Sequence, residues 1–216
     1  MSEPVSFVSR SRALLGSHEA DAVGFGARNL ATKRDTAVRE FAEMEPMRDR
    51  AREIRLRALS NLDRLIGQFA DRLTEAGGTV HFAADAEEAN KIVARILRDS
   101  GARRVVKSHS MVSEEMELNP YLEERGFSVV ETDLGEFIAQ LAGDVPSHII
   151  APVMHMTRFD IGKLFAEKLG VEETSDPIEL NDIARRHLRS IFLQADAGIS
   201  EVNFAVAETD AIITVT

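Results

Sequence analysis

The sequence contains no cysteine, and this absence excludes several kinds of chemistry. The chain forms no disulfide, offers no thiolate nucleophile and ligates no iron–sulfur cluster through sulfur. It also lacks a run of 18 apolar residues, which a membrane-spanning helix would need. Its first residues, Met-Ser-Glu-Pro-Val, lack the basic and then apolar order of a secretory signal. We therefore expect a cytoplasmic protein without a membrane span.

Sequence signatures of nucleotide and metal sites are missing as well. No Gly-x-Gly-x-x-Gly motif follows a predicted strand, and no Gly-x-x-x-x-Gly-Lys-Ser/Thr motif occurs. There is no Gly-x-Ser-x-Gly nucleophile elbow. The six histidines are scattered, without His-Glu-x-x-His or another metal-ligand spacing. We therefore expect no metal site in this chain and no phosphate-binding loop of these two kinds.

The formal net charge of −10 is unevenly distributed along the chain. Up to Arg72 there are 13 basic and 11 acidic residues, whereas the rest of the chain has 13 basic and 25 acidic residues. An acidic surface repels nucleic acid and anionic lipid. We therefore expect no nucleic acid among the partners.

The first part of the chain is predicted to be helical. Residues 1–45 show weak helical periodicity and are expected to form a helical arm. From Pro46, apolar residues three or four apart predict one long amphipathic helix to about Leu73, stopped by Gly77 and Gly78. Its five arginines either pair with neighbouring acids on a solvated face, the simpler interpretation, or form a partner or phosphate site. They are Arg48, Arg50, Arg52, Arg55 and Arg57.

Beyond Gly78, short apolar runs alternate with helical segments. The predicted strands are Thr79–Ala83, Arg104–Lys107, Phe127–Glu131, Ser147–Ala151, Phe204–Ala207 and Ala211–Val215. The predicted helices run from Asp85 to about Asp99, over Asn119–Arg125, from Asp133 to Leu141, over Arg158–Leu169, and from Asp176 to Gln194. This alternation predicts an α/β fold over residues 46–216, with a largely parallel sheet covered by helices on both faces. Because the last apolar run has no element after it, we expect this domain to be incomplete at its carboxyl end.

Polar groups follow four of the predicted strands, where ligands gather in open parallel sheets. The candidate site residues at this rim are Lys107, Ser108, Ser110, Glu131, His155 and Glu208. Lys107 would bind a carboxylate or phosphate, and the serine hydroxyls would orient it. Glu208 and His155 are the candidates for proton transfer. Glu208 ends an apolar run, where a buried carboxylate without a partner would be costly.

Most of these polar groups also have a simpler structural interpretation. Asp133 with Glu136, and Ser113, have the positions of helix-capping residues. His155 fits a structural, hydrogen-bonded histidine. Lys107 is harder to explain in this way, because a cation is uncommon at the end of a buried strand.

Four blocks of the sequence are specific when taken together. They are Val105–Glu115, Glu131–Glu136, Pro146–Pro152 and Gly198–Thr209. In this order they resemble the LUD domain family, and within it the amino-terminal domain of the B-type iron–sulfur subunit of lactate-utilisation systems. The resemblance covers about Arg48 to Thr216. It implies a Rossmann-like three-layer sandwich of the NagB/RpiA/CoA-transferase-like kind, preceded here by the helical arm.

The resemblance also implies a function. Such proteins belong to cytoplasmic complexes that oxidise L-lactate to pyruvate, and a cysteine-rich segment after the LUD domain holds two [4Fe–4S] clusters. These 216 residues lack that segment, so we expect no cofactor in them. Asn203 and Thr209, in the last block, count among the ligand-binding residues. The expected partners are other lactate-utilisation subunits and a small carboxylate, with a homo-oligomer as an open alternative.

Three positions depart from the family pattern. The family tends to carry glycine where this chain has Glu201 and Asp210, and lysine where it has His109. A glycine would allow a positive φ or a close approach of the backbone to a ligand. The two added acids and the lost lysine are expected to weaken the binding of an anion.

Three functions remain open from the sequence. The favoured one is a substrate-binding or docking domain of a lactate-oxidising complex, inactive as an isolated chain. The second is an assembly module without a ligand, in which the polar groups only cap and pair. The third, by analogy of fold, is an acyl- or CoA-transferase-like enzyme with Glu208 as nucleophile.

Overall fold

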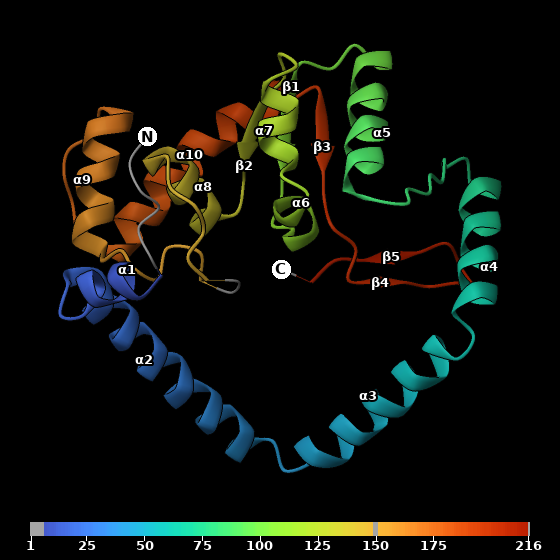
Figure 1. The fold of residues 1–216 in the computed structure, drawn as a ribbon, viewed down its shortest axis with the longest axis horizontal. Helices are drawn as coiled ribbons and strands as arrows, with labels where there is room; N and C mark the ends of the chain where they lie inside the picture. Colours follow the sequence, from blue (N-terminus) through green and yellow to red (C-terminus); the bar gives the residue numbers. More distant parts are fainter. Residues whose placement is uncertain (1–6, 149–150, 216) are drawn as a thin grey trace. The chain divides into compact units, whose positions relative to one another are not determined.

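A computed structural model describes residues 7–148 and 151–215, which form a mixed α/β structure that is mostly helical (Figure 1). The helices are α1 (Phe7–Leu14), α2 (His18–Glu40), α3 (Met44–Leu59), α4 (Leu62–Glu75), α5 (Ala86–Asp99), α6 (Met111–Glu115), α7 (Leu118–Glu123), α8 (Leu134–Ala142), α9 (Arg158–Leu169) and α10 (Pro177–Gln194). The strands are β1 (Arg104–Lys107), β2 (Ser128–Glu131), β3 (Ala197–Ile199), β4 (Phe204–Ala205) and β5 (Ile212–Ile213). The predicted α/β class is confirmed.

The chain divides into two compact units. The first contains residues 1–39 and 131–193, and the second contains residues 40–130 and 194–216. The first unit therefore holds α1, α2 and α8 to α10, and the second holds α3 to α7 together with β1 and β3 to β5. Residues 128–130 of β2 belong to the second unit, and its last residue, Glu131, belongs to the first.

The main sheet has three strands in the order β2-β1-β3. β1 and β3 run parallel, with Val105 opposite Ala197 and Lys107 opposite Ile199. Val105 and Val106 are both buried, although successive residues of a strand point to opposite faces. Both faces of β1 are therefore covered, as in a central strand of a layered α/β fold.

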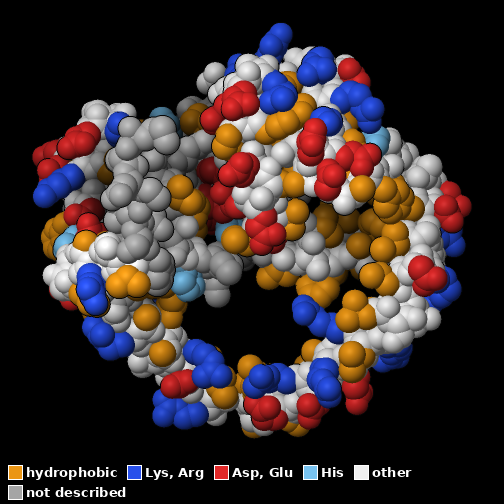
Figure 2. Space-filling model, in the orientation of Figure 1, with side chains coloured by type: hydrophobic (Ala, Val, Ile, Leu, Met, Phe, Trp, Pro, Cys, Tyr) orange, Lys and Arg blue, Asp and Glu red, His pale blue; other side chains and the backbone are white. Residues whose placement is uncertain are grey.

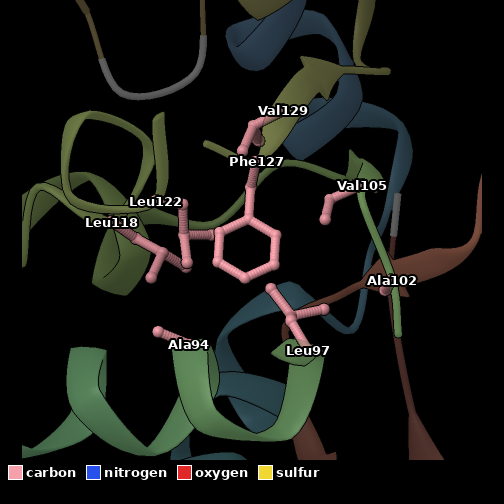
Figure 3. Packing of buried hydrophobic residues seen from close by; sticks show 8 residues of the cluster. All are labelled: Ala94, Leu97, Ala102, Val105, Leu118, Leu122, Phe127 and Val129. Carbon is pink, nitrogen blue, oxygen red and sulfur yellow. The ribbon is translucent and has the colours of Figure 1, made fainter. Parts of the chain in front are cut away.

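The core of the second unit lies between the sheet and two helices, α5 and α7. Ala94 and Leu97 of α5 and Leu122 of α7 pack against Val105 of β1. The ring of Phe127 lies at the centre of this cluster, next to the start of β2 (Figure 3). α5 forms because Asp85 caps its first turn, where its carboxylate accepts from the Glu88 N–H at 2.8 Å. The predicted Asp85 cap is thus confirmed.

In the first unit, aromatic side chains join α8, α9 and α10. The rings of Phe137 and Phe165 lie 6.3 Å apart between centroids, and Phe137 is 5.6 Å from the His187 ring. The start of α2 lies against α9, since the His18 imidazole is 2.8 Å from Asp160 Oδ2. Burial opposes ionisation of Asp160, but hydrogen bonds from Thr157 and His18 outweigh it and lower its pKa to about 2. α1 and α2 confirm that the arm is helical, while residues 1–6 lie outside the described residues.

The predicted long helix over residues 46–73 is in fact two helices. It is interrupted at Ser60 and Asn61, where the Ser60 hydroxyl donates to the Leu56 carbonyl at 2.8 Å. The Asn61 amide donates to the Arg57 carbonyl at 2.9 Å, and its φ of −132° leaves the helical region. Side chains that bond to nearby backbone compete with the helix in this way. The apolar periodicity of the sequence continues through Ser60 and Asn61, so the periodicity alone does not indicate that the helix is interrupted there.

Two predicted strands need correction. Thr79–Ala83 is irregular, and Phe82 within it is exposed, so this run of strand-forming residues has no ladder to join. In Ser147–Ala151, residues 149–150 lie outside the described residues, and the flanking residues are bends. β3, in contrast, was not predicted, because it has three residues and includes Gly198.

The last two predicted strands are short and pair with each other. β4 and β5 form an antiparallel hairpin, which extends toward α4 in the second unit (Figure 1). They are therefore not members of the β2-β1-β3 sheet, as the sequence had suggested. Among residues 7–148 and 151–215, no helix is long and apolar enough to cross a membrane.

Candidate functional site

The most unusual side chain of the second unit is Lys107, the last residue of β1. It is fully buried, and its Nζ lies 2.8 Å from Ser113 Oγ and 3.2 Å from Glu114 Oε1. A buried cation is costly unless it is paired and hydrogen-bonded, and these two contacts supply both conditions. The Glu114 side chain is 30% exposed, so the pair connects the interior with the solvent.

Two serine hydroxyls meet where β1 and β3 end. The Ser108 N–H extends the ladder by donating to the Ile199 carbonyl at 2.9 Å. Beyond this bond, Ser108 Oγ lies 3.1 Å from Ser200 Oγ. The parallel pairing of β1 with β3 thus brings Ser200, which the sequence did not single out, next to Ser108. The sequence analysis did not predict β3, and only the pairing of β3 with β1 shows that Ser200 lies next to Ser108.

The turn after β1 is fixed by the cap of α6. Ser110 accepts from the Ser113 N–H at 3.2 Å, and the Ser113 hydroxyl donates to the Ser110 carbonyl at 2.8 Å. The capping residue is therefore Ser110, and the prediction that Ser113 has this role is wrong. Inside the helix, Ser113 receives the bond from Lys107 instead. We call Lys107, Ser108, Ser110, Ser113 and Glu114 the lysine cluster.

The other end of β1 is fixed to the segment before β3 by an ion pair. Asp196 accepts from the N–H groups of Arg103 and Arg104 at 3.0 and 2.9 Å, and from Arg104 Nη2 at 2.8 Å. The Arg104 guanidinium and these two backbone donors lower the pKa of Asp196 below its usual range. This bidentate contact sets the register of the two strands that carry the lysine cluster and Ser200.

Glu131 and His155 belong to the first unit. Glu131 is a buried residue at the end of β2, and its N–H donates to Gln140 Oε1 at 3.0 Å. The His155 ring lies between a hydroxyl and a carboxylate, with Nδ1 2.7 Å from Ser147 Oγ and Nε2 2.9 Å from Asp144 Oδ2. This arrangement suits a structural histidine and also a proton carrier oriented by a carboxylate. No spacing in the sequence indicated Asp144.

The β4–β5 hairpin carries the three remaining predicted residues. Asn203 Oδ1 accepts from the Val215 N–H at 2.6 Å, and the Asn203 N–H donates to the Ile213 carbonyl at 3.0 Å. Glu208 and Thr209 are exposed near the tip of the hairpin. Within the apolar run before Glu208, Phe204 and Ala205 are exposed and Ala207 is buried. Because the Glu208 side chain itself is exposed, the expectation of a costly buried carboxylate is wrong.

Glu208 lines a groove of about 970 Å³ in the second unit. The groove is formed by α3, α4 and the hairpin, and Figure 2 shows hydrophobic side chains gathered over α4 and the hairpin. Among the arginines of α3, Arg48 pairs with Glu45 at 3.1 Å, which is the solvated-face interpretation. Arg50 and Arg57 line the groove.

The departures from the family pattern have different structural consequences. Asp210 adopts a φ of +63°, so this position requires the left-handed conformation that glycine favours. Glu201 accepts from the Asn203 amide at 3.3 Å within the hairpin. A glycine at position 210 would therefore relieve backbone strain, irrespective of any ligand.

The structure links Lys107 to Ser110 through Ser113 and places Ser108 next to Ser200. Asn203, Glu208 and Thr209 lie on the hairpin. That all candidate residues share one pocket stays a prediction. Across the described ranges, no group of three or more His, Asp or Glu side chains has the arrangement of a metal site. A [4Fe–4S] cluster does not fit this chain, because there is no cysteine to ligate it.

Comparison with known proteins gives consistent matches. Residues 66–216 match the LUD domain family. The chain is 43% identical over 187 residues to "Lactate utilization protein B" of Bacillus cytotoxicus, which covers 87% of this chain and 40% of that relative. It is also 43% identical over 195 residues to the protein of the same name from Bacillus cereus (strain AH820). That match covers 90% of this chain and 41% of the relative. The chain thus spans about 40% of the length of the curated relatives that it matches. No solved structure matches it.

Proposed function

The chain belongs to the LUD domain family, and on that premise we propose that it is a small-carboxylate-binding or docking domain of a complex that oxidises L-lactate to pyruvate. The observation that carries the proposal is the buried Lys107 at the carboxyl end of β1. Its partner Glu114 is itself a carboxylate held by the ammonium group. The contact between the Lys107 ammonium and the Glu114 carboxylate is therefore of the same kind as the contact that a small carboxylate ligand would make.

Binding would proceed by exchange of carboxylates at Lys107. Glu114 is partly exposed, so its carboxylate would be solvated if it turned outward, and its place at the Lys107 ammonium would be open to another carboxylate. An incoming lactate carboxylate would take that place at the Lys107 ammonium. The hydroxyls of Ser108 and Ser200, 3.1 Å apart where β1 and β3 end, would be available to the rest of the ligand. Within the first unit, His155 is oriented by Asp144 in a way that suits a proton carrier.

The remaining parts of the proposal come from the family. The complete domain would be a NagB/RpiA/CoA-transferase-like sandwich, to which the parallel pair β1–β3 would contribute. The iron–sulfur clusters that accept electrons would be held outside these 216 residues, since the chain has no cysteine. The partners would be other lactate-utilisation subunits in the cytoplasm. Nucleic acid is disfavoured by the net charge of −10.

A second candidate, an assembly module without a ligand, is favoured by one observation. Lys107 is bonded to Ser113 and Glu114, and Ser110 caps α6, so the cluster fulfils structural roles without a ligand. The acyl-transfer alternative is less well supported. Glu208 is exposed to water, whereas a carboxylate nucleophile is normally activated by its surroundings.

The substitution Lys107→Met separates the first two functions. It is made in a protein of the relatives' full length, within the assembled lactate-oxidising complex. A charge-assisted hydrogen bond contributes about 1.5–3 kcal/mol, so kcat/KM for L-lactate should fall roughly 10- to 150-fold. Lys91→Met is the control, because Lys91 pairs with Glu87 on the exposed face of α5. Unchanged turnover in Lys107→Met, with an intact complex, would favour the assembly module.

A further inference from the structure

The first unit contains a cleft of about 720 Å³ that has no assigned role. It is formed by one face of α10 and by the segment that leads into α8. The described residues that line it are Thr132, Leu134, Asn181, Ala184, Arg185, Leu188, Arg189 and Phe192. Its volume is within the range of small-molecule sites.

The charge in this cleft has one sign. Arg185 and Arg189 both line it, and no carboxylate is among the described lining residues. Neither guanidinium lies within ion-pair distance of an acid in the described part of the chain. The two cations are one helical turn apart, and like charges at this spacing repel each other. Two arginines that line one cleft, in a chain of net charge −10, thus form a local site for an anion.

The rest of the cleft is mainly apolar. Leu134 comes from the start of α8, and Ala184, Leu188 and Phe192 come from the same face of α10 as the two arginines. Half of the Phe192 side chain is exposed, so an apolar group placed on it would remove it from water. Thr132 and Asn181 add a hydroxyl and an amide for polar contacts.

We propose that this cleft binds an amphipathic organic anion, with an oxyanion head on Arg185 and Arg189 and an apolar body on Leu134, Leu188 and Phe192. The guanidinium fork matches both carboxylate and phosphate oxygens, so the head is either of these. The proposal is independent of lactate binding at the lysine cluster, because none of the cluster residues lines the cleft.

The test uses the whole ¹⁵N-labelled chain, titrated with octanoate and with octyl phosphate while amide shifts are recorded. Either ligand should give saturable shifts at residues 132–134 and 181–192, and the tighter one identifies the head group. Octanol, which lacks the charge, and acetate, which lacks the chain, should bind at least tenfold more weakly. The double substitution R185Q/R189Q should weaken binding at least tenfold.

Arg186→Gln is the matched control. Arg186 is the next residue on α10 and is exposed, but it does not line the cleft. This variant removes a charge of the same sign, and its dissociation constant should stay within twofold of the unmodified chain. Thermal melting confirms that the variants are folded. The proposal is overturned if neither anion saturates, if octanol binds as tightly as octanoate, or if R186Q weakens binding as much as R185Q/R189Q.

Discussion

The Lys107 ammonium and the Ser113 hydroxyl lie 2.8 Å apart, and this contact joins the end of β1 to the first turn of α6. Ser113 accepts this bond while it donates to the Ser110 carbonyl, so its position is fixed on both sides. Lys107 is thereby held at the carboxyl end of a strand whose other end is fixed by Asp196. The lysine cluster is thus pre-organised before any ligand arrives.

The first prediction concerns Asp196 and pH. Folding lowers its pKa, so its stabilising contribution is present above the unfolded-state pKa of about 3.9 and is lost as the pH falls below that value. Asp196→Asn should lower the urea midpoint at pH 7, and the difference from the unmodified chain should shrink toward pH 3. Asp71→Asn, on the exposed face of α4, is the control. A difference that does not depend on pH would contradict the role of this carboxylate.

The second prediction concerns the positive φ of Asp210. Because alanine is strained in the left-handed region, Asp210→Gly should be more stable than Asp210→Ala by about 1 kcal/mol. The same pair at Glu208, whose φ is not positive, should show the opposite order, since glycine there only adds unfolded-state entropy. Urea denaturation of the four variants measures both differences. If the glycine and alanine variants had the same order of stability at both positions, Asp210 would not be strained.

The third prediction concerns the close approach of α9 to the segment before α10. A Cβ at Gly162 would lie 2.0 Å from the Thr174 carbonyl oxygen, which belongs to the backbone. Gly162→Ala should therefore destabilise the chain by about 1–3 kcal/mol, the usual cost of overpacking. Gly67→Ala, in the open on α4, should instead stabilise it by about 0.5–1 kcal/mol. Calorimetric melting of both variants checks the two signs.

The fold was predictable where a local signal fixes an element. Asp85, Asp133 and Asp176 cap helices as expected, because capping depends on residues within one turn. The break at Asn61 and the strand β3 were not predictable. The break depends on a side-chain bond that competes with the helix, and β3 depends on a partner strand that is distant in sequence.

The fourth prediction concerns the hairpin. Phe204 and Ile212 are 52% and 57% exposed on paired strands, and such apolar edges favour association. We expect this chain to self-associate through the hairpin, and Phe204→Asp to shift sedimentation velocity profiles toward the monomer. Phe82→Asp is the control, because Phe82 is also exposed, at 66%, but lies in an irregular segment. A chain that is monomeric at all concentrations would contradict this prediction.

The candidate site was predictable only in part. Lys107, Ser108 and Ser110 were found because the end of a parallel strand is a local feature with a general meaning. The partners Ser200 and Asp144 were not found, because only the fold brings them to Ser108 and His155. Glu208 was misjudged because an apolar run does not reveal whether it is buried.

The fifth prediction tests the central claim, that the lysine cluster binds a small carboxylate. The ¹⁵N-labelled chain is titrated with L-lactate, and the amide shifts of Ser108, Ser110 and Ser200 are followed. The account predicts saturable shifts at these amides that are lost in Lys107→Met and retained in Lys91→Met. Saturable shifts that persist in Lys107→Met, or no saturable shift in the unmodified chain, would contradict it.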